Sequence, residues 1–238
     1  MKFNLMNKLG GVALLTVTMT LGARANIVYD NTSTDTGYNL SVTNGQMVGD
    51  QIILNSSTPV TLTSFSFEFY SPNATFTGSV MGEVWLYAND GAGTLLSGGY
   101  ATPSTVLLDS TPFSLSTAQQ YTSTSPGGPF DVATLNFDLS SSPLLVPTNF
   151  TMVVSFTGLT GSDSVGVELF NPVTVGQNYP DYWYLNNGDA NWSLRTNLLT
   201  PVNFGAQFVG AVPEPSMVSF ALAGMAGLVG MGLGRRRR

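Results

Sequence analysis

Apolar and polar residues alternate along most of the chain between residues 26 and 211, in short runs separated by polar, Gly- or Pro-containing segments. The clearest run has Phe150, Met152, Val154 and Phe156 at every second position. A period of two places alternate side chains on opposite faces of a β-strand, and no run shows a persuasive period of 3.6. The pattern therefore predicts an all-β domain of about ten to twelve strands.

The apolar runs and the segments between them predict where the strands and loops lie. Turns are expected at 31–35 and 89–93, and a Ser/Thr/Gly/Pro-rich loop at 121–129. With no internal repeat and no linker, this pattern favours one jelly-roll-like sandwich of two antiparallel sheets. The expected strands are 27–29, 38–42, 48–54, 60–69, 80–88, 106–109, 113–115, 135–139, 150–156, 165–169 and 202–208.

The run 60–69 changes its parity partway along. Val60 and Leu62 are followed by Phe65 and Phe67, so the apolar positions shift from even to odd numbers. Because no turn residue interrupts the run, the shift predicts either a β-bulge or a strand that changes the sheet it faces.

The first 25 residues have the pattern of a secretory signal peptide. Lys2 and Lys8 precede an apolar stretch, 9–22, that is too short to span a bilayer, and Ala23-Arg24-Ala25 is a small-x-small cleavage site. We expect export through the Sec machinery and a mature chain that begins at Asn26.

The last 27 residues, 212–238, contain three features in order: Pro213-Glu214-Pro215, an uncharged apolar segment, and Arg235, Arg236, Arg237 and Arg238. Residues 217–233 would span roughly 25 Å as a helix, and adding Ser216 and Gly234 reaches the lower edge of a membrane-spanning length. Terminal arginines hold that end on the cytoplasmic side. We therefore predict a transmembrane segment at 216–234.

This tail resembles the PEP-CTERM sorting signal of Gram-negative bacteria. The resemblance implies that an exosortase, a membrane protease, processes the chain after transient anchoring in the inner membrane. It also implies release to the cell surface or extracellular matrix, often alongside exopolysaccharide. An ordinary single-span anchor is the alternative, but such an anchor needs no Pro-Glu-Pro segment and is seldom so rich in glycine.

The stretch from Leu62 to Trp192 is similar to the weakly characterised choice-of-anchor domains. The similarity lies in Leu62-Thr63-Ser64-Phe65-Ser66-Phe67, in Trp85-Leu86-Tyr87-Ala88-Asn89-Asp90-Gly91 and in Asp181-Tyr182-Trp183. It implies a β-sandwich at the cell surface and brings no catalytic residues with it.

The charge of residues 26–211 is strongly acidic. Of the fourteen acidic residues only Glu214 lies outside this range, and of the eight basic residues only Arg195 lies inside it, which gives a formal net charge of −12. Such a surface cannot neutralise phosphates, so nucleic acid is excluded as a partner.

The chain contains no cysteine and no histidine. This removes thiolate chemistry, the usual general base near neutral pH and the commonest zinc ligands. We interpret the chain as a non-enzyme. Glycoside hydrolysis by two carboxylates ~5 to 9.5 Å apart stays open, and Glu83 and Glu168 are the strand carboxylates to consider, although outward-facing positions are the simpler interpretation.

The richest cluster of side chains for ligand binding is Tyr182, Trp183, Tyr184 and Trp192, with Asn and Asp between them. Aromatic faces stack on sugar rings, and amides and carboxylates bind hydroxyl groups. The favoured alternative is packing: a hairpin with Trp192 opposite Trp183, in which Tyr182 and Tyr184 face one side while Trp183 and Leu185 fill the core.

Two acidic turns and one arginine complete the candidates. Asn89-Asp90-Gly91 and Asn187-Gly188-Asp189 could supply oxygen ligands to calcium, although neither has the spacing of a calcium loop and a polar turn is the simpler interpretation. Arg195 could clamp a ligand, but a structural ion pair is the safer interpretation. No cofactor is otherwise expected.

Two functions follow from the sequence. The first is an exported, exosortase-processed surface or matrix protein with a structural or adhesive β-sandwich. The alternative is a carbohydrate-binding module that recognises exopolysaccharide.

Overall fold

The computed structural model describes residues 25–123, 129–196 and 201–211, and all regular structure in these ranges is β-strand, as the sequence predicted. The predicted signal peptide at 1–25, apart from Ala25, and the predicted sorting tail at 212–238 lie outside the described residues. Within the described residues no helix is long and apolar enough to cross a membrane.

The strands are β1 (Asn26–Asp30), β2 (Asp35–Ser41), β3 (Met47–Ile53), β4 (Val60–Ser71), β5 (Met81–Gly91), β6 (Thr102–Asp109), β7 (Phe113–Ser114), β8 (Tyr121–Ser123), β9 (Phe130–Asp138), β10 (Leu144–Val146), β11 (Asn149–Thr157), β12 (Gly166–Phe170), β13 (Asp181–Leu185), β14 (Ser193–Thr196) and β15 (Ala206–Ala211).

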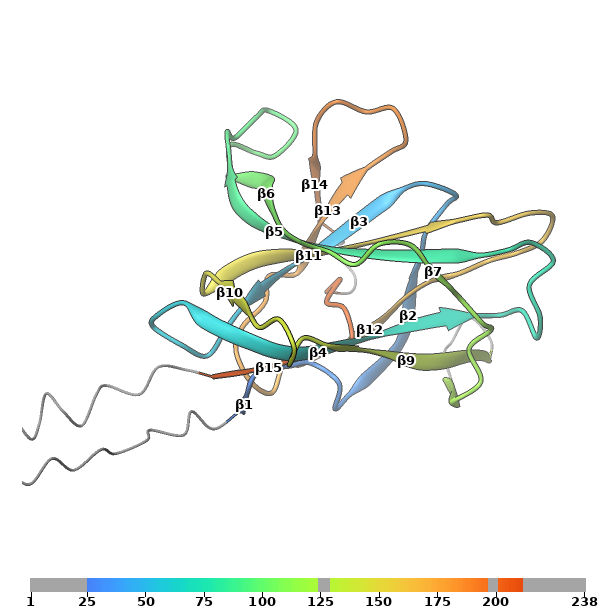
Figure 1. Ribbon diagram of the computed structural model, residues 1–238. Coiled ribbons are helices and arrows are strands. Elements are labelled where there is room, and N and C mark those ends of the chain that lie inside the picture. The colour runs from blue at the N-terminus through green and yellow to red at the C-terminus, as the bar shows by residue number, and fades with distance from the viewer. Residues whose placement is uncertain (1–24, 124–128, 197–200, 212–238) are drawn as a thin grey trace, which may run out of the picture.

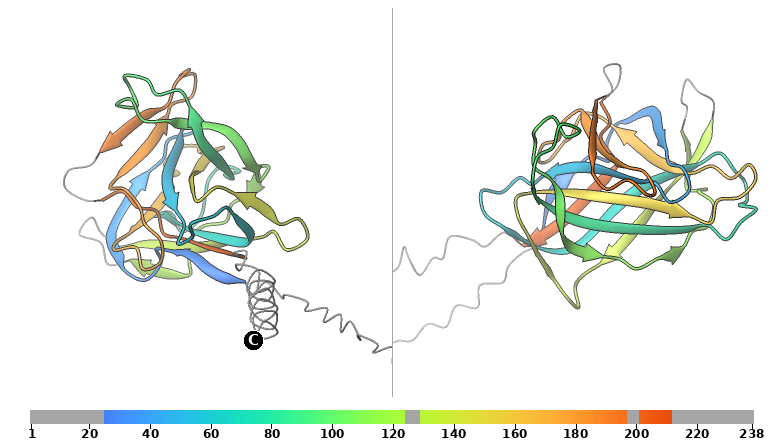
Figure 2. Two further views of the ribbon diagram at one scale, coloured as in Figure 1. Left: turned by 90° about the vertical axis from the view of Figure 1, so that its left-hand side faces the viewer. Right: turned by 90° about the horizontal axis from the view of Figure 1, so that it is seen from above.

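The strands form two antiparallel sheets that pack face to face (Figure 1). Sheet A has eight strands in the order β1-β15-β4-β12-β2, with β9 and β10 also paired to β4 and β8 paired to β9. Sheet B has seven strands in the order β14-β13-β3-β11-β5-β6, with β7 paired to β5. The views in Figure 2 show strands of both sheets around one interior. The predicted sandwich of two antiparallel sheets is therefore confirmed.

The interior between the sheets is dominated by aromatic side chains. Phe65 of β4 stacks on Phe137 of β9 and on Phe208 of β15, with ring centroids 4.4 Å and 5.4 Å apart. Phe150 of β11 meets Phe208 edge-on at 5.2 Å, which joins sheet B to sheet A. Aromatic pairs in these arrangements add to the free energy of burial, so this group anchors the two layers.

The parity change in β4 is caused by a β-bulge. Val209 of β15 pairs with Ser64, but the next residue, Gly210, pairs with Leu62, so Thr63 is the extra residue. The bulge returns Val60 and Leu62 to the same buried face as the phenylalanines that follow them. The sequence-based prediction of a bulge at this position is confirmed.

The turn predicted at 89–93 is wrong. The sequence Asn89-Asp90-Gly91 was expected to end the strand, but β5 continues to Gly91 and pairs with the start of β6 through three register irregularities. Asp90 is held by this ladder, since its carboxylate accepts hydrogen bonds from Thr105 N and Oγ1 at 3.0 Å and 2.7 Å. The chain reverses later, between Thr94 and Tyr100.

The first three residues of the expected loop at 121–129 belong to a strand instead. Residues Tyr121–Ser123 form β8, which pairs with β9, and 124–128 lie outside the described residues.

Candidate functional site

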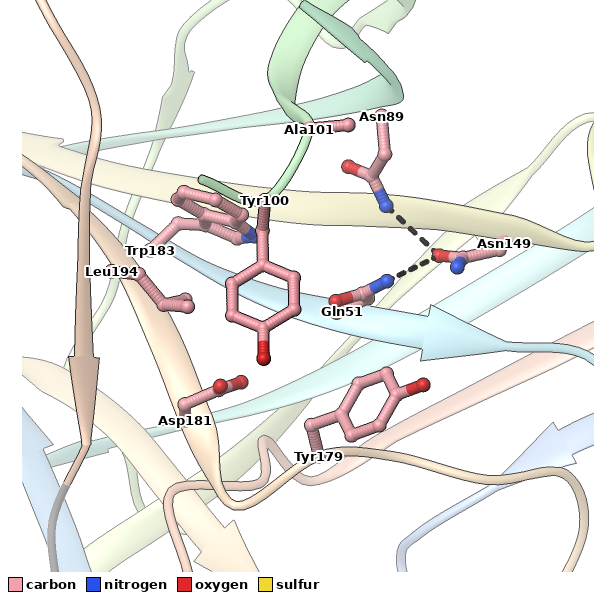
Figure 3. A pocket seen from close by; sticks show the side chains of 9 residues that line it. All are labelled: Gln51, Asn89, Tyr100, Ala101, Asn149, Tyr179, Asp181, Trp183 and Leu194. Carbon is pink, nitrogen blue, oxygen red and sulfur yellow. Dashed lines mark hydrogen bonds between the residues drawn. The ribbon is translucent and has the colours of Figure 1, made fainter. Parts of the chain in front are cut away.

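A pocket of about 420 Å³ opens on the outer face of sheet B. The β5–β6 and β13–β14 hairpins both rise above this face in Figure 1, and the pocket lies at their base. Its lining comes from parts of the chain that are far apart in sequence (Figure 3). The lining residues are Gln51, Asn89, Tyr100, Ala101, Asn149, Tyr179, Asp181, Trp183 and Leu194.

The strand register places Trp183 on the outer face of sheet B. Trp183 pairs with Gly49 of β3, whereas Tyr184 pairs with Val48, whose side chain belongs to the interior. Paired residues share a face, so Trp183 points away from the interior. It is nevertheless only 2% exposed and forms the floor of the pocket.

This arrangement reverses the predicted packing of the strand. Tyr182 and Tyr184 pack against the interior cluster, while Trp183 is buried on the opposite face. The predicted hairpin register is also wrong, because Leu194 and not Trp192 lies opposite Trp183. Trp192 is half-buried and meets Tyr87 of β5 edge-on at 6.1 Å, outside the pocket lining. Of the four predicted glycan-binding residues, the pocket contains Trp183 alone.

Two exposed tyrosines form the walls of the pocket. Tyr100 is 66% exposed and Tyr179 is 49% exposed. Two hydrogen bonds order the loop that carries Tyr100: Ser97 Oγ donates to Tyr100 O at 2.8 Å within the loop, and Leu194 N of β14 donates to Leu96 O at 2.9 Å. The second bond ties the two hairpins together, so Tyr100 is held over the pocket.

An amide network forms the side of the pocket opposite Asp181 (Figure 3). Asn149 Oδ1 accepts hydrogen bonds from Gln51 Nε2 at 2.8 Å and from Asn89 Nδ2 at 2.9 Å, and Thr151 Oγ1 donates to Asn89 Oδ1 at 2.6 Å. These bonds fix the orientation of three amides. They use neither the carbonyl oxygen of Gln51 nor the amide nitrogen of Asn149, so one acceptor and one donor are prepositioned for a ligand.

The indole N–H of Trp183 has no hydrogen-bond acceptor among the described residues. A buried donor without an acceptor costs about 1–3 kcal/mol.

Asp181 is the single charged residue among those that line the pocket. Its partial burial raises the pKa of its carboxyl group above the usual value. Arg195 lies on the other face of the hairpin, because it pairs with Tyr182, and its guanidinium is 4.6 Å from the centre of the Tyr184 ring. Arg195 thus contacts an aromatic ring, and the expected ion pair is not found within the part of the chain that the structure describes.

The two acidic turns have structural partners. Asp90 binds Thr105, and Asp189 Oδ2 accepts a hydrogen bond from Asn186 N at 3.2 Å. Among the residues that the structure describes, no group of three or more acidic side chains is arranged to hold a metal ion. The calcium hypothesis therefore gains no site in this part of the chain.

Glu168 is buried, in contrast to the outward exposure expected from the sequence. It lies on β12 with 0% exposure, and neither of its carboxyl oxygens has a hydrogen-bond partner among the described residues. Burial, together with the neighbouring carboxylates of Asp35 and Glu68, raises its pKa to about 10. Tyr121 OH donates to Glu68 Oε2 at 2.6 Å in the same cluster, which belongs to sheet A and is separate from the pocket.

Sequence reasoning missed most of the pocket. Tyr100 follows Gly98 and Gly99 in a turn, and Tyr179 precedes Pro180, so both tyrosines lie in irregular segments without periodicity. Their position in loops at the end of a strand was the available signal, because loops carry binding residues more often than strands do. Comparison of the chain with protein families, curated proteins and solved structures found no match.

Proposed function

We propose that the chain is an exported surface protein whose sandwich binds a glycan in the pocket on sheet B. The pocket carries the proposal: Trp183 forms its floor, Tyr100 and Tyr179 its walls, and an ordered amide network one side. Apolar ring faces combined with a few fixed polar groups are the features with which proteins bind sugars. Adhesion to exopolysaccharide is then the role of the domain.

The ends of the domain are compatible with processing at both termini. β1 begins at Asn26, the expected first residue of the mature chain, and β15 ends at Ala211, just before the Pro-Glu-Pro segment. Asn26 pairs with Gly210, so both ends leave sheet A side by side. Removal of both predicted signals would leave every strand of the described residues intact. Figure 1 shows these two ends of sheet A away from the β13–β14 hairpin, at the base of which the pocket lies.

We also propose a topology for the sandwich, a helix at each end of it, and a cellular location. The sandwich is jelly-roll-like, with a signal-peptide helix before it and a transmembrane helix after it. Sec machinery and an exosortase-type protease are its processing partners, and the inner membrane is a transient stage before the cell surface. The pairing of strands far apart in sequence, such as β4 with β15, supports the jelly-roll description.

Processing is tested by expressing the full chain with an internal tag in a bacterium that has an exosortase system. We expect a mature protein that begins at Asn26 and has lost the C-terminal arginines, as measured by mass spectrometry of the surface fraction. The same host without its exosortase is the control, and should retain the tail in the membrane. Full-length chain in the cytoplasm would refute the export proposal.

Glycan binding is tested with Tyr100→Ala and Tyr179→Ala on an array of bacterial exopolysaccharide fragments. Each variant is expected to weaken binding about tenfold, because it removes one wall of the pocket. Tyr38→Ala is the matched control, since Tyr38 is a similarly exposed tyrosine, 47%, on β2 of the other sheet. If the wild-type chain binds no glycan, or if Tyr38→Ala weakens binding equally, the pocket is not a glycan site and a purely structural role remains.

A further inference from the structure

The charge inside the pocket is unbalanced. Asp181 is the only charged residue in the lining, and Arg195, the only basic residue between 26 and 211, lies on the other face of the hairpin. A ligand that enters the pocket therefore meets one carboxylate without a protein cation beside it.

The unpaired negative charge of Asp181 is unfavourable because of where the side chain lies. The side chain is half-buried at the start of β13, and the lost solvation raises the pKa of its carboxyl group. Figure 3 shows the carboxylate on the same side of the pocket as the hydroxyl of Tyr100, with Tyr179 beside them. A cation placed here would replace the lost solvation and would also lie near two aromatic faces, which attract positive charge.

Resting on the proposed function, we propose that the pocket selects glycans that carry a free amino group, with the sugar ammonium bound by Asp181 between Tyr100 and Tyr179. The remaining hydroxyl groups of that sugar meet the carbonyl oxygen of Gln51 and the amide nitrogen of Asn149. The formal charge of −12 on residues 26–211 attracts a polycationic glycan at long range in addition.

The same arrangement excludes acidic glycans. A uronate or sulfate group in the pocket would face Asp181 with no basic residue in the lining to pair with it. Like charges in a partly desolvated site repel strongly, so acidic polysaccharides are poor ligands.

The test measures binding of three tetrasaccharides to the full-length chain in detergent, at low salt and slightly acidic pH. The probes are β-1,4-linked glucosamine, its N-acetylated counterpart and a glucuronate-containing tetramer. The wild-type chain is expected to bind the glucosamine tetramer about tenfold more tightly than the N-acetylated one. The glucuronate tetramer is expected to bind weakest.

Asp181→Asn is expected to abolish the preference for the amine while retaining binding of the N-acetylated tetramer. Asp189→Asn is the matched control, because Asp189 is an exposed aspartate of the same hairpin outside the pocket, and it should keep the wild-type ranking. An unchanged ranking in Asp181→Asn, or equal binding of the glucuronate tetramer by the wild type, overturns the selectivity and leaves glycan binding intact. No binding of any tetramer or exopolysaccharide fragment overturns glycan binding itself.

Discussion

Replacing Asp50 with alanine is expected to lower the free energy of unfolding by about 4 kcal/mol. Asp50 is a fully buried residue on the inward face of β3, and its Oδ2 accepts hydrogen bonds from Phe204 N and Asn178 Nδ2, both at 2.7 Å. Asn178 Nδ2 also reaches Tyr29 OH at 3.0 Å. The network joins β3 of sheet B to β1 of sheet A, and its loss leaves Phe204 N without this acceptor and Asn178 Nδ2 with Tyr29 OH alone.

Asp50→Asn separates the role of the oxygen from the role of the charge. Burial raises the pKa of Asp50 well above its usual value, which favours the neutral acid. Asparagine is neutral and keeps one oxygen where both hydrogen bonds converge, so we expect it to cost less than about 1 kcal/mol.

Urea unfolding followed by tryptophan fluorescence measures both Asp50 variants. If Asp50→Asn is as damaging as Asp50→Ala, the carboxylate charge is needed and the neutral form is not the native one. If Asp50→Ala is as stable as the wild type, the network does not hold the sheets together.

Replacing Glu168 with glutamine is expected to stabilise the domain by about 2–3 kcal/mol at neutral pH. The pKa of Glu168 is raised to about 10 in the folded chain, against an ordinary value of 4.5. Below the ordinary value both the folded and the unfolded chain hold the proton, and the stability linked to Glu168 is fully present. As pH rises, the unfolded chain loses the proton first, so this stability is lost progressively until the folded pKa is reached.

Glutamine has no carboxyl group that titrates, so the variant loses this pH dependence of stability. The melting temperature of Glu168→Gln should therefore exceed that of the wild type by roughly 6 °C at neutral pH and should differ little at pH near the ordinary value. Asp189→Asn, at an exposed position, is the control and should keep the wild-type melting temperature at neutral pH. A lower melting temperature for Glu168→Gln at neutral pH would contradict the prediction, and would mean that the neutral acid is not the native form of Glu168.

At the pocket on sheet B, the alternation of apolar and polar residues predicted a strand but not the orientation of its side chains. The alternation around Trp183 gave the correct strand, but it could not tell which face of β13 points inward. Large apolar residues are expected to face the interior, and here the two hairpins bury Trp183 on the outer face of sheet B instead. A period of two separates the faces of a strand without saying what covers each face.

The sequence by itself determined the β class of this protein, most strand positions and the bulge at Thr63, because a side-chain period of two and a change of its parity are local properties. The same local patterns predict its targeting ends, which lie outside the described residues. Tertiary structure alone decided the continuation of β5 through Asn89-Asp90-Gly91, the burial of Asp50 and Glu168, and the pocket. Each depends on segments far apart in the chain: β3, β5, β11 and the β13–β14 hairpin line the pocket only after the strands of sheet B have paired, and no periodicity within one segment predicts that pairing.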